Sequence, residues 1–405
     1  MTDIKKLSRR AFNQTALTGL VAASVAPWMA GSARAEGDIK IGFNGDLSAS
    51  PSAQSGRAAV VGIQAAIEDL KAKGQGFSLV IRDDLSQPPK SIQNMSDLID
   101  SEKVVSVFGP TNSGNALAWR QIPNQKRIPV MGCIGSATDI TKPVSANADN
   151  YMFRVGSVDR TQVVALMAYA KKSPNAKKIG FLTETTGYGQ GGLKDLQEIA
   201  ALQGLNVVAN EKFNVNDTDM TSQLGKLKAA GVDTAMVWAQ GTPIGQLMRS
   251  MEKIDYFPVV LTSWAADNLS FINASGPALA EKPIFLRTVS EARTPFQQAF
   301  FDRIRPKIDA DSAFSFAVHG YDAMVLLALA IKQAGSTDGA KVREALEDLK
   351  APFEGYAKSY SKPFSKAEHD ALTAADQRWT CWRGGKLAAF KDTVVEGLKP
   401  EDFKG

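Results

Sequence analysis

VVSVFGPTNSGN, at residues 104–115, joins an apolar, strand-like run to a polar turn that can begin a helix. The run stops at Gly109 and Pro110, and the residues that follow Asn115 can continue the helix. Such a turn presents hydroxyl groups and free backbone N–H groups at the positive end of a helix dipole, which favours a carboxylate. Serine and threonine at this place are also common as plain helix N-caps. The turn therefore predicts a candidate anion site, with plain capping as the alternative.

Strand-like and helical patterns alternate on both sides of this turn. Strand-like runs occur at residues 39–43, 77–81, 129–131, 179–183, around 207, 234–238 and 259–262. Helical spacing of apolar residues marks residues 57–70, 88–101, 161–172, 193–202, 220–230 and 244–253. Strands separated by helices of this length indicate parallel sheets with helices on both faces. Ligands bind beyond the carboxyl ends of such strands, so we expect the site to be lined by the loops after Phe43, Phe108, Met131, Thr183, Trp238 and Thr262.

The first 35 residues read as an export signal. Arg9 and Arg10 precede Phe12, an apolar run follows at residues 16–26, and residues 33–35 form an A-x-A cleavage pattern. The paired arginines indicate the twin-arginine export machinery, which carries folded proteins. No cysteine lies near the cleavage pattern, and we expect no later run to span a bilayer. The sequence therefore predicts a periplasmic protein that begins near Glu36.

The charge balance changes once this signal is set aside. The chain has 47 basic and 42 acidic residues, and the signal holds five of the basic residues and one of the acidic ones, which leaves 42 and 41. No basic stripe with interleaved aromatic residues is present, so we expect no nucleic-acid partner.

Few side chains suggest catalysis or metal binding. Cys133 and Cys381 are compatible with a disulfide or with two separate buried thiols. With His319 and His369 they show no metal-ligand spacing, so we expect neither a metal nor a cofactor. The pair at residues 83–84, Asp-Asp, is typical of a polar turn, and no activated nucleophile or metal set accompanies it to indicate an exported hydrolase. We expect no enzyme activity.

The strand ends resemble those of the periplasmic leucine/isoleucine/valine-binding proteins, the type I solute-binding proteins of ATP-driven importers. The resemblance is carried by IGFNGDLS at 41–48, RDD at 82–84, VFGPTNSG at 107–114, IPVM at 128–131 and GYGQG at 187–191. It implies an α/β protein with two lobes, each a doubly wound, mostly parallel sheet with helices on both faces. The family's three hinge crossings fall near Val155, Leu286 and Lys350. Lobe 1 would then comprise residues 36–154 and 286–350, and lobe 2 residues 155–285 and 351–405, with Tyr356 and Tyr360 packing in lobe 2.

The family's ligand-holding positions can be carried over one at a time. The hydroxyl that binds the ligand carboxylate falls on Ser113, and a backbone N–H and a second hydroxyl fall on Ile134 and Ser136. The aromatic residue that closes over the ligand falls on Tyr188. All the groups needed to bind a carboxylate are therefore present.

Three positions differ from amino-acid binders of the family or bear on ligand shape. Trp264 stands where, in those binders, an acidic residue pairs with the ligand ammonium, and Asp267 is an alternative partner for that ammonium. Trp264 could instead pack at the hinge without contacting the ligand. Gly241 replaces a tyrosine, which predicts a longer and flatter cavity, and Phe316 matches an aromatic residue that packs on the ligand, with a core position as its alternative. A buried ammonium without an acid costs several kcal/mol. We therefore expect an aromatic or branched acid without an α-amino group.

These observations predict a monomeric periplasmic protein that captures a small carboxylate by hinge closure and delivers it to an inner-membrane ABC permease. Two alternatives stay open. One is transport of a branched-chain amino acid or amide, and the other is ligand sensing with a receptor partner.

Overall fold

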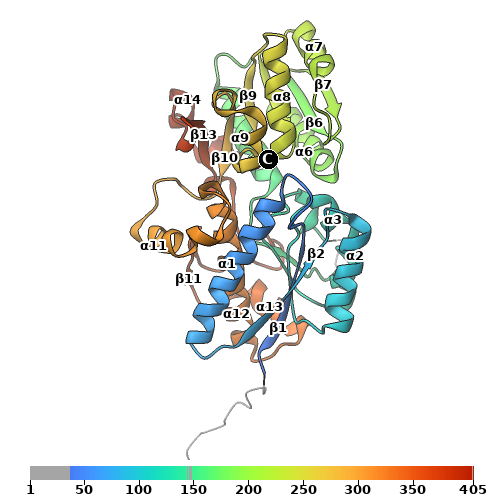
Figure 1. Cartoon of the computed structure of the whole chain (residues 1–405), viewed down its shortest axis with the longest axis vertical. Helices are drawn as coiled ribbons and strands as arrows, with labels where there is room; N and C mark the ends of the chain where they lie inside the picture. The colour runs from blue at the N-terminus through green and yellow to red at the C-terminus, as the bar shows by residue number, and fades with distance from the viewer. Residues whose placement is uncertain (1–36, 144, 146–147, 404) are drawn as a thin grey trace, which may run out of the picture. The chain divides into compact units, whose positions relative to one another are not determined.

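The computed structural model describes residues 37–405 apart from 144, 146, 147 and 404, and the predicted export signal lies outside them. The part from Asp38 to Gly405 is built around two large β-sheets, each with helices on both faces (Figure 1), and also contains a short two-stranded sheet. The sheet of the first lobe has the order β2-β1-β3-β4-β5, and every neighbouring pair is parallel. Its strands are β1 (Ile39–Gly45), β2 (Phe77–Asp83), β3 (Val107–Phe108), β4 (Val130–Gly132) and β5 (Met152–Arg154).

Alternating side chains on these strands bury both faces of the first sheet. Phe108, Met131 and Phe153 belong to one core cluster, while their neighbours Val107 and Val130 belong to the other. The first cluster also holds residues of α1 (Ala53–Ala72), α11 (Pro295–Ile304), α12 (Phe314–Ala334) and α13 (Gly339–Glu347). The second is covered by α2 (Pro88–Ser96), the π-helical turn Asp97–Ser101, α3 (Ser113–Trp119) and α4 (Gln121–Lys126).

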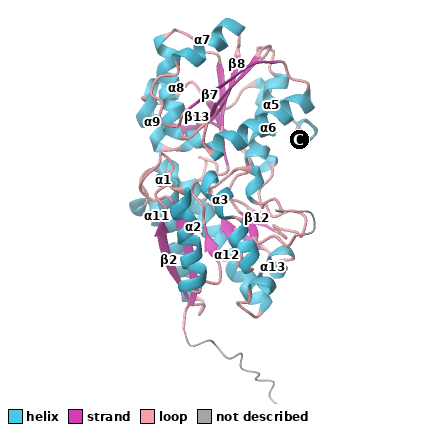
Figure 2. Cartoon of the chain, turned by 90° about the vertical axis from the view of Figure 1, so that its right-hand side faces the viewer, coloured by secondary structure: helices cyan, strands magenta, loops and turns pink. Residues whose placement is uncertain are grey.

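The sheet of the second lobe is mixed, with the order β14-β13-β10-β9-β8-β6-β7. Its parallel strands are β6 (Ile179–Glu184), β7 (Val207–Phe213), β8 (Thr234–Trp238), β9 (Val259–Thr262) and β10 (Ile284–Arg287). Antiparallel strands β13 (Arg378–Arg383) and β14 (Lys386–Ala389) complete one edge. The helices are α5 (Asp159–Lys172), α6 (Gly187–Gln203), α7 (Thr221–Ala230), α8 (Gly241–Lys253), α9 (Leu269–Ser275), α10 (Pro277–Ala280) and α14 (Thr393–Glu396). In Figure 2, α8 and α9 lie on one side of the strands and α5 and α6 on the other.

The segment after α13 differs from the predicted lobe boundary near Lys350. It forms the short strands β11 (Phe353–Glu354) and β12 (Ser359–Tyr360), and Tyr360, Phe364 and Ala371 are buried in the core of the first lobe. Tyr356 stacks on Phe300 with ring centroids 4.0 Å apart. The aromatic residues at 356 and 360 thus pack in lobe 1 rather than lobe 2. They do so because they cover apolar surface of α11 and α12 that would otherwise be exposed. The chain enters the second sheet only at β13.

Helix α12, with the turn before it, is long and apolar enough to cross a membrane by length and composition, over Asp311–Ala334. The sequence prediction that no later run would do so is therefore wrong by length and composition. However, 89% of its most apolar 18-residue stretch is buried inside the protein, so α12 is a core helix of the first lobe. Both cysteines are free and buried.

Candidate ligand-binding site

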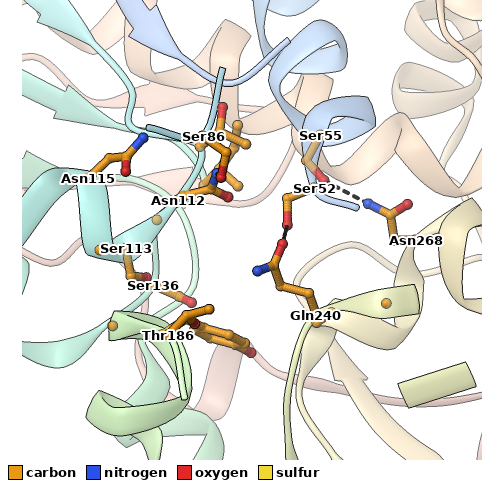
Figure 3. Close-up of a pocket in the computed structure, with 18 of the residues that line it drawn as sticks. Ser52, Ser55, Ser86, Asn112, Ser113, Asn115, Ser136, Thr186, Gln240 and Asn268 are labelled. Atoms are coloured by element: carbon orange, nitrogen blue, oxygen red, sulfur yellow. Dashed lines mark hydrogen bonds between the residues drawn. The ribbon is translucent and has the colours of Figure 1, made fainter. Parts of the chain in front are cut away.

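A cavity of about 320 Å³ lies between the carboxyl ends of the two sets of parallel strands (Figure 3). All six loops expected to line the site contribute to it, after β1, β3, β4, β6, β8 and β9, together with the loop after β2 and Phe316 of α12. Strand order reverses between β1 and β3 in the first sheet and between β6 and β8 in the second. Ligands of doubly wound sheets bind at such reversals.

Helix N-termini surround this cavity. The N-cap residues of five helices line it: Ser52 of α1, Asn112 of α3, Thr186 of α6, Gln240 of α8 and Asn268 of α9. The N-cap side chains of α3 and α8 make no hydrogen bond to the first turns of their own helices, which leaves N–H groups available to a ligand. Every described residue that lines the cavity is uncharged. The donors that the cavity offers to an anion are therefore backbone N–H groups and neutral side chains, with no basic side chain among its described lining residues.

Ser113 is the first residue of α3 rather than its N-cap, which is Asn112. The Ser113 hydroxyl accepts a hydrogen bond from the Ala137 N–H at 3.2 Å, and its own proton has no acceptor among the described residues. Ile134 and Ser136 line the cavity beside it. The plain-cap alternative therefore does not describe Ser113, whose hydroxyl proton is available to a ligand oxygen.

An aromatic wall lies on the other side of the cavity. Trp264 and Phe316 are both buried, with ring centroids 5.1 Å apart. The backbone N–H of Trp264 donates to Gln162 Oε1 at 2.8 Å, and the Tyr188 and Ser263 hydroxyl groups share a hydrogen bond of 2.5 Å. The structure thus brings all seven predicted ligand-binding residues to one cavity: Ser113, Ile134, Ser136, Tyr188, Gly241, Trp264 and Phe316. Their contact with a ligand remains a prediction.

Gly241 does not enlarge the cavity in the way the sequence suggested. A Cβ atom added at Gly241 would lie 2.4 Å from Ser270 Oγ and 3.0 Å from the Phe271 backbone nitrogen. The position that a side chain would take is therefore filled by the start of α9. Glycine is required here because α8 and α9 pack closely, which leaves no open space at this wall.

Asp267 is not placed to replace the missing acidic partner of an ammonium. It is 1% exposed and does not line the cavity. Its carboxylate accepts hydrogen bonds from Arg287 Nε at 2.7 Å and from Ser315 Oγ at 2.8 Å. Burial raises the pKa of Asp267 to about 6, against the lowering effect of the Arg287 charge.

Polar contacts across the cavity join the two lobes. Ser52 donates to Gln240 Oε1 at 2.9 Å, and the Asn268 amide donates to Ser55 Oγ at 3.2 Å. Sequence reasoning missed these residues, although each lies at or beside a helix N-terminus that follows a strand. That position was the signal available, since the loops themselves were predicted to line the site.

Asp159 lies behind the cavity, fully buried at the start of α5. Burial raises the pKa of Asp159 to about 7, and the nearby Ser136 and Trp238 lower it by a smaller amount. Neither of these two residues makes a hydrogen bond of normal geometry with the Asp159 carboxylate. Burial raises the pKa of Tyr188, and the nearby Asp159 carboxyl group adds to that rise.

Asp46, Asp83 and Asp84 form an acidic cluster near the end of β1. Asp46 and Asp83 accept hydrogen bonds from loop N–H groups, and Asp84 accepts from Ser91 and from Asn115 at 2.7 Å. These bonds fix the loops after β1 and β2, in line with the polar-turn interpretation.

Comparison with known proteins gives a family and a fold. A family described as periplasmic binding protein matches residues 38–377. Leu/Ile/Val-binding protein homolog 7 of Brucella abortus is 25% identical over 388 residues, covering 91% of this chain and 95% of that protein. Among the solved structures that share the fold is a branched-chain amino acid substrate-binding protein from Streptococcus pneumoniae in complex with isoleucine. It has a TM-score of 0.75 and 23% identity, and the match covers 87% of this chain and 98% of that one. Another is a Rhodopseudomonas palustris solute-binding protein in complex with 4-hydroxybenzoate, with a TM-score of 0.73 and 19% identity, and the match covers 88% of this chain and 96% of that one.

Proposed function

Because the chain belongs to the periplasmic binding protein family, we propose that it captures a small carboxylate and delivers it to an ABC permease. Family members bind small ligands and work with such permeases. The proposed ligand is an aromatic or branched acid without an α-amino group, bound by hinge closure. Ser113 and Ser136 would hold the carboxylate, and Trp264, Phe316 and Tyr188 would contact the body of the ligand.

The observation that carries this proposal is the uncharged lining surrounded by helix N-termini. Each N-terminus acts as roughly half a positive charge, so an anion is stabilised there without a basic side chain. An ammonium at the same place would face positive dipole ends. It would also lack a carboxylate partner among the cavity-lining residues, which costs several kcal/mol.

The fold alone does not select the ligand class. One structural relative holds isoleucine and another holds 4-hydroxybenzoate. The choice therefore depends on the lining residues. Trp264 lines the cavity, and the resemblance predicts that it stands where amino-acid binders carry the acidic partner of the ammonium. Phe316 extends the aromatic surface beside it.

A thermal-shift screen tests the proposal. The purified protein is heated with benzoate, cinnamate and branched 2-oxo acids in one set, and with leucine, isoleucine, valine and short amides in another. A ligand at a hundredfold excess over its Kd stabilises the folded state by about 2.7 kcal/mol, which is visible as a rise in Tm. Larger shifts with leucine or valine than with any of the acids would contradict the proposal and favour branched-chain amino acid binding.

The export route and the partners belong to the same proposal. Arg9 and Arg10 should direct the folded protein through the twin-arginine machinery to the periplasm, where it acts as a monomer. Replacing both arginines with lysine should leave the precursor in the cytoplasm, as seen by cell fractionation. Ligand-dependent stimulation of a reconstituted permease would favour transport over sensing.

A further inference from the structure

Gln240 projects into the cavity from the second lobe, at the N-terminus of α8 (Figure 3). It is 8% exposed and uncharged. Its side chain does not cap α8, because it makes no hydrogen bond to the first turn of that helix. The side-chain amide is held instead by two residues outside the helix, Glu184 and Ser52.

Glu184 determines which end of the Gln240 amide faces the rest of the cavity. Glu184 ends β6 and is 1% exposed. Its carboxylate accepts hydrogen bonds from the Gln240 backbone N–H at 2.9 Å, from Gln240 Nε2 at 3.2 Å and from Thr186 Oγ1 at 2.5 Å. Because Glu184 acts as the acceptor in all three bonds, the amide nitrogen of Gln240 faces it. The amide oxygen then faces the first lobe, where Ser52 donates to it at 2.9 Å.

This arrangement leaves hydrogen-bonding capacity for a ligand. A side-chain amide offers two donor hydrogens and two acceptor lone pairs. Among the described residues, Glu184 takes one hydrogen and Ser52 takes one lone pair, so one donor and one acceptor position remain. A hydroxyl group suits either position, because it can donate to the free lone pair or accept from the free hydrogen. An ammonium or a second carboxylate matches only one of them.

We propose that Gln240 is a specificity-determining residue that binds a hydroxyl group of the ligand, which is therefore a hydroxylated carboxylic acid. This inference rests on the proposed function, since it takes the carboxylate at Ser113 and Ser136 as given. Gln240 belongs to the second lobe and the two serines to the first. A ligand that carries both groups therefore contacts both lobes. Glu184 is a positioning residue that holds the amide in this orientation.

Isothermal titration calorimetry with matched ligand pairs tests the inference. Benzoate is compared with its 2-, 3- and 4-hydroxy derivatives, and cinnamate with its ring-hydroxylated derivatives. Because one neutral hydrogen bond changes affinity about two- to tenfold, at least one hydroxylated isomer should bind the wild-type protein tighter than its parent by that factor. The measured quantity is the ratio of the two Kd values, so a general loss of affinity in a variant does not affect it.

Two variants assign the preference to this pair of residues. Gln240→Leu removes both polar atoms at similar volume, and the ratio should fall to about one. Glu184→Gln keeps the volume but lets the Gln240 amide turn over, so the ratio should fall while Gln240 itself remains. Circular dichroism and thermal melting verify that each variant is folded, and Ser113→Ala serves as a control that weakens parent and hydroxylated acid alike.

The outcomes separate this inference from the proposed function. Equal binding of parent and hydroxylated acids by the wild-type protein would overturn the role of Gln240 and leave acid binding intact. A ratio that survives in Gln240→Leu would also overturn it and would assign the hydroxyl to another cavity residue. Binding of amino acids in place of any acid would remove the proposed function itself, and this inference with it.

Discussion

Gly187→Ala is expected to weaken ligand binding by preventing full closure of the two lobes. Gly187 begins α6 in the second lobe and lies against Gly114 of α3 in the first. A Cβ atom at Gly187 would lie 2.8 Å from Gly114 Cα and 3.3 Å from its nitrogen. Both are backbone atoms at the rim of the cavity, so they cannot move aside as the end of a flexible side chain would.

The size of the effect follows from overpacking. An added methyl group in a tight contact costs about 1–3 kcal/mol, which corresponds to about a 5- to 150-fold rise in Kd. The contact joins the lobes, so slight opening relieves it, and the Tm of the ligand-free protein should change little. Gly187 is not among the residues with positive φ, so alanine itself is tolerated by the backbone.

Gly114→Ala is the matched control on the other side of the same contact. Its Cβ atom would lie 3.7 and 3.8 Å from Gly187 atoms, which is ordinary van der Waals distance. This variant should bind within about twofold of wild type. Calorimetry with the tightest acid from the screen measures both variants. Equal Kd values for Gly187→Ala and Gly114→Ala, or a large loss of Tm in ligand-free Gly187→Ala, would refute the reasoning.

Three further substitutions test the site and its surroundings. Ser113→Ala should weaken acid binding by about 1–3 kcal/mol, because a hydrogen bond to a charged group is lost, and unchanged calorimetric affinity would show that Ser113 does not touch the ligand. Trp264→Glu should lose the favoured acid and gain weak leucine binding, whereas Trp264→Phe should keep the aromatic surface and most of the affinity. If the glutamate variant still binds the acid, Trp264 does not contact the ligand. In the wild-type protein the folded-state pKa of Asp159, about 7, lies above the unfolded value near 4. The free energy of unfolding should therefore decline as pH rises from about 4 to 7, because the buried carboxyl group must ionise. Asp159→Asn should lessen this decline. Its stability gain over wild type, at most a few kcal/mol, should be largest at pH 8 by urea unfolding, and parallel pH profiles would rule the mechanism out.

The sequence was informative wherever local pattern and burial agree. Strands β8 and β9 were predicted at the residues where they occur, because short apolar runs between helices have few other structures open to them. Strand β3 is shorter than the predicted run from Val104, although the Val105 N–H still bonds to the Lys40 carbonyl at 2.9 Å. Helix α6 begins at Gly187, well before the predicted start. Its glycines oppose helix formation locally, but Gly192 lies where a Cβ atom would overlap the Trp238 ring, so packing dictates the residue.

The candidate site was predictable in its loops but not in its partners. Parallel strands place their carboxyl ends together, so the lining loops followed from the order of elements alone. The direction of a side chain does not follow from that order. Gly241 illustrates the limit, since only the packing of α9 reveals that the position cannot open the cavity. The Glu184–Gln240 pair depends on a contact between residues 56 apart, which no local pattern encodes.

The discontinuous first lobe bears on how the protein is made. Its core contains Ile41 of the first strand and Ala371 near the other end of the chain. Helix α12, which packs on α1, is also synthesised late. At about 5–20 residues per second a ribosome needs tens of seconds to make this chain, and for most of that time the apolar face of β1 and α1 has no covering. We expect the nascent first lobe to depend on a holding chaperone until its last segment emerges, while α5 to β10, which is continuous in sequence, folds around its own sheet first.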